Sequence, residues 1–172
     1  MRWLTASVIL IGLVIYYARQ KRTVHIAPKD KTSVGSAPTT EEIQSTIGSG
    51  DFGKMDTMLE KVRNPLHRHQ LLNALVKKAY SERSQPAVRK KLYEYGRRYL
   101  DEFDQIAPEL KRESDGEGIN APALKSMAIA MEEDGNYQEA LAVCDTALKW
   151  DLDDGTKSGY DGRIDRIRKK QA

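Results

Sequence analysis

The 172-residue sequence is poor in the residues that build covalent or metal-bound frameworks, since it has a single cysteine, Cys144, and three histidines. One cysteine excludes an intramolecular disulfide, and no paired cysteines or cysteine–histidine spacing is available for a structural zinc ion. We therefore predict a protein of a reducing compartment, without a metal or a cofactor, in which Cys144 is an inert thiol of the core.

The sequence also lacks the short motifs that carry chemistry, because no GxSxG elbow, HExxH pair or phosphate-binding loop occurs. Gly48, Gly50 and Gly53 spell GxGxxG, but the preceding EEIQSTI is charged and does not resemble a buried strand, which favours a turn between helices. His67 and His69 are two residues apart and point in different directions on a helix, which disfavours a shared metal. We predict no enzymatic activity and no small-molecule substrate.

Acidic residues are missing from residues 1–22, which hold four basic residues. The rest of the chain therefore has 24 of the 28 basic residues against all 25 acidic ones. A nearly neutral body disfavours a nucleic-acid partner, whose phosphates call for a basic surface. The aspartates of residues 151–154 resemble a calcium loop without its spacing, so we interpret them as an acidic turn that ends a helix.

Residues 3–18, WLTASVILIGLVIYYA, contain no charge and are followed at once by Arg19, Lys21 and Arg22. As a helix this run is about 24 Å long, and flanking side chains can extend its reach toward the ~30 Å of a hydrocarbon core. The pattern predicts a transmembrane signal anchor with a basic flank over residues 1–22, which crosses the membrane once.

The flanks of the uncharged run predict its orientation, because Lys and Arg are more numerous after it than before it. We expect the amino terminus outside and the carboxyl-terminal domain in the cytoplasm. A cleaved signal peptide is the alternative, and it would leave a periplasmic or secreted protein. It is disfavoured because Tyr16 and Tyr17, and not small residues, stand before Ala18.

Residues 23–39 are rich in Thr, Ser, Pro and Gly, which predicts a flexible tether. Residues 40–172 predict an all-α domain that starts with a helix from Thr40 to about Ile47 and a second helix over 54–62. A further pair is expected around residues 71–79 and 88–103, with a break at residues 84–86. A last helix with Tyr160, Ile164 and Ile167 on one face has the character of a terminal cap.

Residues 104–121 contain Pro108 and the run SDGEG, which predict an unusually long connection between helices. We interpret this segment as either a mobile loop or a site.

Small and aromatic residues recur at fixed spacing in residues 121–152. Small residues allow two helices to cross closely, and an aromatic residue fills the wedge beside the turn; the residues concerned are Ala128, Gly135, Tyr137, Ala140, Cys144 and Ala147. This pattern resembles the tetratricopeptide repeat family. A second, degenerate copy has the same relative spacings at Gly50, Phe52, Met55, Leu59 and Val62.

The resemblance implies stacked helical hairpins, about three pairs plus a carboxyl-terminal capping helix, which act as a binding scaffold. In the family, ligand contacts lie on the inner face of the first helix of each pair. Matched by position, these contacts would come from Lys78, Glu82, Lys125, Ile129 and Glu132, and their mixed charge favours a protein or peptide partner.

We therefore predict a membrane-anchored adapter that recruits or organises a protein partner on the cytoplasmic side. The first alternative is a structural subunit of a membrane complex, whose grooves are filled permanently. The second is a membrane-bound hydrolase that uses paired carboxylates such as Glu109 and Asp115.

Eight basic residues lie among tyrosines in residues 77–98, and this combination is found in RNA-binding and lipid-binding surfaces as well as in ordinary helices. We interpret them as a solvated helix face beside buried tyrosines, with an anionic lipid surface as the alternative. They are Lys77, Lys78, Arg83, Arg89, Lys90, Lys91, Arg97 and Arg98.

Overall fold

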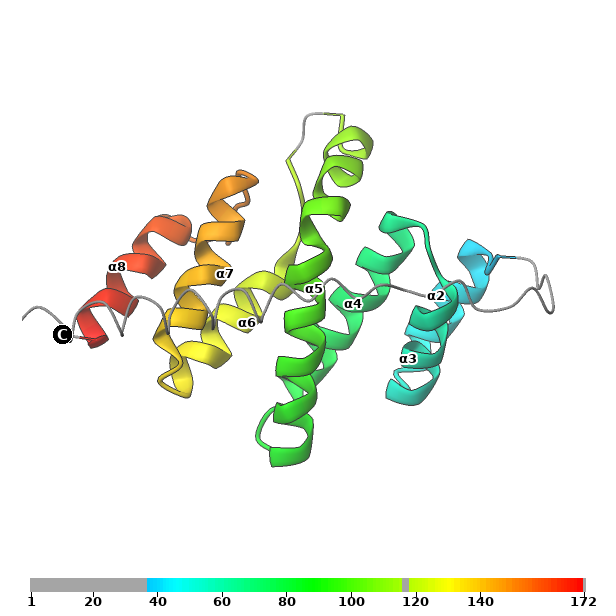
Figure 1. Ribbon diagram of the computed structural model, residues 1–172, viewed down its shortest axis with the longest axis horizontal. Coiled ribbons are helices and arrows are strands. Elements are labelled where there is room, and N and C mark those ends of the chain that lie inside the picture. Colours follow the sequence, from blue (N-terminus) through cyan, green and yellow to red (C-terminus); the bar gives the residue numbers. More distant parts are fainter. Residues whose placement is uncertain (1–36, 116–117, 172) are drawn as a thin grey trace, which may run out of the picture. The chain divides into compact units, whose positions relative to one another are not determined.

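The computed structural model describes residues 37–115 and 118–171 (Figure 1). These residues form seven α-helices and no strand, which confirms the prediction of an all-α domain. The helices are α2 (Thr40–Gly48), α3 (Phe52–Lys61), α4 (Pro65–Ser81), α5 (Pro86–Glu113), α6 (Pro122–Glu133), α7 (Tyr137–Lys149) and α8 (Gly159–Gln171). The predicted anchor over residues 1–22 and most of the predicted tether lie outside the described residues. None of the described helices is long and apolar enough to cross a membrane.

The first helices begin where local side chains cap them. Thr39 accepts a hydrogen bond from the backbone of Glu42, whose carboxylate in turn accepts one from the backbone of Thr39. This reciprocal capping box satisfies backbone donors that have no partner in the first helical turn. Asp51 caps α3 with one such bond, which its carboxylate accepts from the backbone N–H of Lys54 at 3.0 Å. Asn64 caps α4, in which Pro65 takes the first position, where its missing N–H costs nothing.

The helices pack as successive neighbours, and the first helix of one pair also packs on the first helix of the next. Within pairs, α2 packs on α3, α4 on α5 and α6 on α7, and α8 packs on α7. Between pairs, α2 contacts α4 and α4 contacts α6. This arrangement places α2, α4 and α6 side by side, so residues far apart in the chain share one surface.

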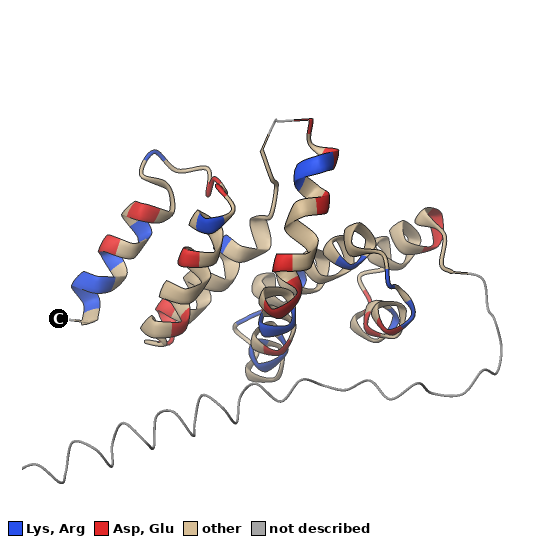
Figure 2. Cartoon of the chain, turned by 45° about the horizontal axis from the view of Figure 1, so that its top comes forward, with Lys and Arg blue, Asp and Glu red and all other residues tan. Residues whose placement is uncertain are grey.

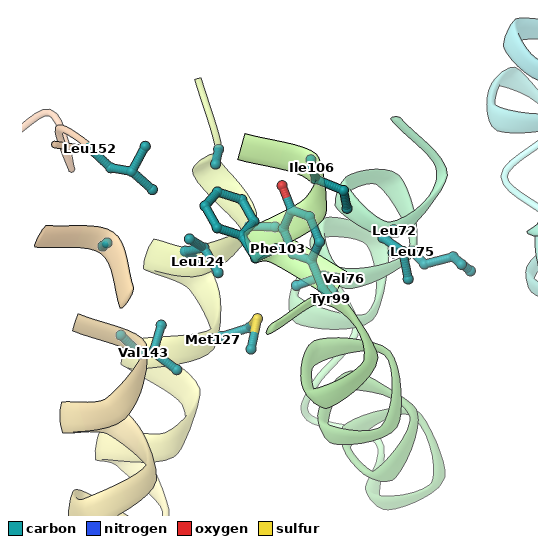
Figure 3. Packing of buried hydrophobic residues seen from close by; sticks show 14 of the residues in the cluster. Leu72, Leu75, Val76, Tyr99, Phe103, Ile106, Leu124, Met127, Val143 and Leu152 are labelled. Carbon is teal, nitrogen blue, oxygen red and sulfur yellow. The ribbon is translucent and has the colours of Figure 1, made fainter. Parts of the chain in front are cut away.

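Two aromatic side chains of α5, Tyr99 and Phe103, form the centre of the core. Both are fully buried, and their rings meet edge to face with centroids 5.3 Å apart, a geometry that aromatic quadrupoles favour. In Figure 3 they lie between side chains of α4, among them Leu75, and side chains of α6, among them Leu124 and Met127. Burial of this layer holds the second and third pairs together.

The prediction of a long connection over residues 104–121 is wrong for its first half, because α5 continues to Glu113 through Pro108. The apolar stripe of α5 extends past Phe103 to Ile106 and Ala107, both of which are buried. Their burial outweighs the hydrogen bond that a proline removes, and here that loss falls within the last two turns of the helix. The connection that remains is short, and Ile119 and Ala121 within it are buried.

The crossing of α5 and α6 depends on Gly96, which is buried against Met127. A β-carbon at residue 96 would lie 2.8 Å from Cε and 3.2 Å from Sδ of Met127. We expect Gly96→Ile to lower the free energy of unfolding by about 1–3 kcal/mol, because a branched side chain must push α6 away from α5. Urea unfolding of the full-length chain in mild detergent, followed by circular dichroism, measures this.

Gly48→Ile is the matched control for Gly96→Ile, because a β-carbon at residue 48 has no atom within 4 Å. We expect it to have the smaller effect. Equal stability losses in both variants would show that helix propensity, and not the crossing at Met127, explains the result.

Candidate functional site

Three adjoining hollows follow the surface that α2, α4 and α6 share. The first, of about 460 Å³, lies between α2, the start of α3 and α4. The second, of about 440 Å³, lies between α4, the end of α5 and residues 118–122. The third, of about 430 Å³, lies between residues 118–125 and the loop after α7. We call this continuous surface the inner groove.

One face of α4 forms the middle of the inner groove. His69, Gln70, Asn73 and Lys77 line both the first and the second hollow. They recur at the spacing that puts residues on one side of a helix, whereas the other side of α4 is buried in the core. The helix is therefore polar where the groove runs and apolar where α5 and α6 pack.

The side-chain amides of Gln70 and Asn73 use only their oxygen atoms in hydrogen bonds with other described residues. The oxygen of Gln70 accepts a bond from Gln44 Nε2 at 3.1 Å, and the oxygen of Asn73 accepts one from the backbone N–H of Ala123 at 3.1 Å. Neither amide nitrogen donates a hydrogen bond to another described residue. Both side chains line the first and second hollows, where a ligand can accept a hydrogen bond from their nitrogens.

A histidine–tyrosine pair lies under the middle of the groove. His69 Nδ1 and the Tyr99 hydroxyl are 2.7 Å apart, and Tyr99 is fully buried. Burial lowers the pKa of His69 to about 4, so the ring is neutral at physiological pH. The pair connects the groove surface to the core without placing a charge there.

The predicted partner-binding residues are divided between the groove and other contacts. Lys78 lines the first hollow and Lys125 lines the third. Glu82, which lines none of the three hollows, forms an ion pair with Lys78 at 2.5 Å. Ile129 is half-buried and outside the hollows. Glu132 pairs with Lys170 of α8 at 2.7 Å, and Arg163 lies 3.8 Å away, so its carboxylate is engaged within the chain.

Gln44, Gln70, Asn73 and Asn120 of the groove were absent from the sequence prediction. A signal for two of them was present, because Gln70 and Asn73 interrupt the apolar pattern of α4 three residues apart. Uncharged amides are common on helix surfaces, so this spacing alone does not single them out. Asn120 has no helical periodicity, and only the packing of residues 118–121 places it in the groove.

Most of the eight basic residues near the tyrosines take part in ion pairs, several of which join different helices. Arg83 and Arg89 bind Glu133 at 3.0 and 3.1 Å, and Arg89 also binds Asp134 at 2.7 Å, which joins the α4–α5 turn and α5 to the end of α6. The hydroxyl of Tyr93 donates to the same Asp134 carboxylate. These basic side chains therefore link helices through ion pairs, in addition to forming the solvated face that we predicted.

The residues considered for chemistry lie apart from the inner groove. Cys144 is fully buried, as predicted, and burial raises the pKa of its thiol to about 11. Glu109 pairs with Arg112, and neither Glu109 nor Asp115 lines one of the three hollows. Among the described residues, no group of three His, Cys, Asp or Glu side chains is arranged to hold a metal ion.

These observations define an all-α domain with a polar groove along α2, α4 and α6, the first helix of each pair. The chain matches no protein-family model, and comparisons with curated proteins and with solved structures found no match.

Proposed function

We propose that the protein is a membrane-anchored adapter with a tetratricopeptide-like domain whose inner groove binds an extended segment of a partner protein. The observation that carries this proposal is the pair of open amide donors, Gln70 and Asn73, in the middle of the groove. An extended segment exposes backbone N–H and C=O groups, and a side-chain amide can bond to either.

The helix pairs support a repeat of this type. α6 and α7 have 12 and 13 residues and are separated by a turn in which Gly135 has a φ of +72°. Gly50 has a φ of +61° at the matching place between α2 and α3. The matched positions that follow are buried in both pairs, as in Met55 and Ala140. The same spacing therefore serves the same packing role twice.

The anchor rests on the uncharged run of residues 3–18 and its basic flank. Attachment to a membrane raises the local concentration of the groove near membrane-bound partners without adding contacts. The same flank supports a domain on the cytoplasmic side.

The adapter is favoured over a structural subunit by the surface of the described residues. Permanent interfaces are large and hydrophobic, whereas Leu148, 38% exposed, is the one large hydrophobic residue exposed in the described part of the chain. A polar groove that exchanges its ligands fits this surface better.

Photo-crosslinking in cells tests the proposal. We expect the photoreactive residue p-benzoylphenylalanine at Gln70 or Lys77 of the full-length chain to form covalent adducts with a protein partner, because both positions line the groove. The adducts are identified by mass spectrometry in the membrane fraction. Removal of residues 1–22 is expected to shift them to the soluble fraction.

Lys90 is the matched control position, since its side chain is 79% exposed on α5 and lines none of the three hollows. We expect no adduct there, and a weaker adduct at Gln70 when Asn73→Leu removes the amide. Adducts of equal yield from Lys90, or a yield that Asn73→Leu does not change, would contradict a role for the groove.

A further inference from the structure

The three hollows of the inner groove have a fixed order along the surface. The first and second share four residues of α4, and the second and third share residues 118–120 and Pro122. The first and third share none, so the second lies between them. A segment that fills the groove must therefore pass from α2 and α4, over residues 118–122, to the loop after α7.

The α2 end of the groove is basic. Lys77 and Lys78 line the first hollow, and no carboxylate does. Lys77 is exposed and forms no ion pair with another described residue, whereas Lys78 is paired with Glu82. The charge that a ligand meets at this end is chiefly that of Lys77.

The opposite end of the groove is acidic. Asp151, Asp153 and Asp154 line the third hollow with one base, Lys125. The Asp154 carboxylate is buried and bound to Arg163 at 2.9 Å, while Asp151 and Asp153 are exposed and form no ion pair with described residues. Figure 2 shows these acidic residues in red at the start of the connection between α7 and α8, which also holds a basic residue in blue.

The middle of the groove is rich in amides and shares its one basic residue, Lys77, with the α2 end. Lys77 and Glu113 are the groups of opposite sign in the second hollow, beside the amides of Gln70, Asn73 and Asn120. Amides match a peptide backbone whatever its side chains are. The order along the groove is thus basic, then amide-rich, then acidic.

We propose that the ligand of the inner groove is an extended peptide segment of mixed charge, with Asp or Glu at the end that lies over α2 and α4 and Lys or Arg at the end that lies over residues 151–155. Complementary charges at two ends specify the direction of a bound chain as well as its identity. This inference rests on the proposed function, because it names the class of segment that the adapter recognises.

Selection from a phage-displayed library of random short peptides on the full-length chain in mild detergent tests the inference. We expect enriched peptides to carry acidic residues toward one end and basic residues toward the other. Lys77→Glu and Asp153→Lys are each expected to weaken binding of these peptides about tenfold, the effect of losing one close charge contact. Lys90→Glu is the matched control and is expected to leave binding unchanged. Circular dichroism checks that each variant is folded.

Two other outcomes separate this inference from the proposed function. Enriched peptides that need Asn73 but show no charge preference, or bind Lys77→Glu as well as the wild type, would overturn the mixed-charge ligand and leave the groove as a peptide site. Failure to enrich any peptide whose binding Asn73→Leu weakens would overturn both.

Discussion

Replacement of Arg163 by Met is expected to lower the free energy of unfolding by about 3–5 kcal/mol, the usual cost of leaving a buried charge without its partner. The Arg163 guanidinium is 4% exposed and lies 2.9 Å from the Asp154 carboxylate, which is fully buried. Glu132 of α6 is the second carboxylate beside it. Removal of the arginine leaves the Asp154 carboxylate without its ion-pair partner in a place that water hardly reaches, whereas Glu132 keeps its pair with Lys170.

The pKa of Asp154 explains why this loss depends on charge. Burial alone would raise that pKa, but hydrogen bonds from Thr156 and Arg163 outweigh it and lower the pKa below its usual value. The carboxylate is therefore ionised in the folded protein at neutral pH, and the stability from this pairing is present above the unfolded pKa and lost as the pH falls through the folded one.

A double variant separates charge from packing at this place. Arg163→Met combined with Asp154→Asn removes the unpaired charge, and we expect it to recover more than half of the stability that Arg163→Met loses in urea unfolding at neutral pH. Arg166→Met, at an exposed position of the same helix, is the control and is expected to change stability by about 0.5 kcal/mol or less. A double variant no more stable than Arg163→Met would show that packing of α8, and not the ion pair, explains the loss.

Acid is expected to destabilise the domain through His69. Burial lowers the folded pKa of His69 from 6.5 to about 4, so between these values the unfolded chain binds a proton that the folded chain does not. The corresponding stability is complete above about pH 6.5 and falls by up to about 1.4 kcal/mol per pH unit as the pH drops toward 4. The loss on reaching pH 4 is about 3 kcal/mol.

Unfolding in urea at several pH values between 4 and 7 measures the contribution of His69. We expect His69→Gln to flatten this part of the pH profile. Tyr99→Phe is expected to keep the pH dependence, because burial and not the hydroxyl lowers the pKa. An equally steep profile in His69→Gln would assign the acid sensitivity to other groups.

Local sequence patterns predicted most helices of the described region. The capping pattern around Thr40 and the apolar spacing in α3, α4 and α7 each match a helix in the structure. Gly50 and Gly135 lie in turns and adopt a positive φ that favours glycine. The prediction of a turn is wrong for Gly48 and Gly53, which lie in α2 and α3 because both helices extend closer to Gly50 than predicted. Patterns of this kind are readable because caps, turns and amphipathic faces depend on residues only a few positions apart.

The continuation of α5 shows where local patterns fail. Pro108 and the following SDGEG are local signals for an end of the helix, and they predicted a long connection. Burial of Ile106 and Ala107 against other helices outweighs them. The end of α5 and residues 118–120 form one wall of the second hollow. This wall depends on the burial of Ile106 and Ala107, which no local pattern predicts.

The sequence by itself determined the helical class of the described residues, the turns at Gly50 and Gly135, and the burial of Cys144, because each depends on neighbouring residues or on a strongly apolar face. Only the tertiary structure brought Gln44, Gln70 and Asn120 to one groove, paired Glu132 with α8 and placed a lysine at one end of the groove and aspartates at the other. These residues lie many positions apart in the chain. Buried contacts of α2, α4 and α6 across the whole core bring them together, and no single segment contains those contacts.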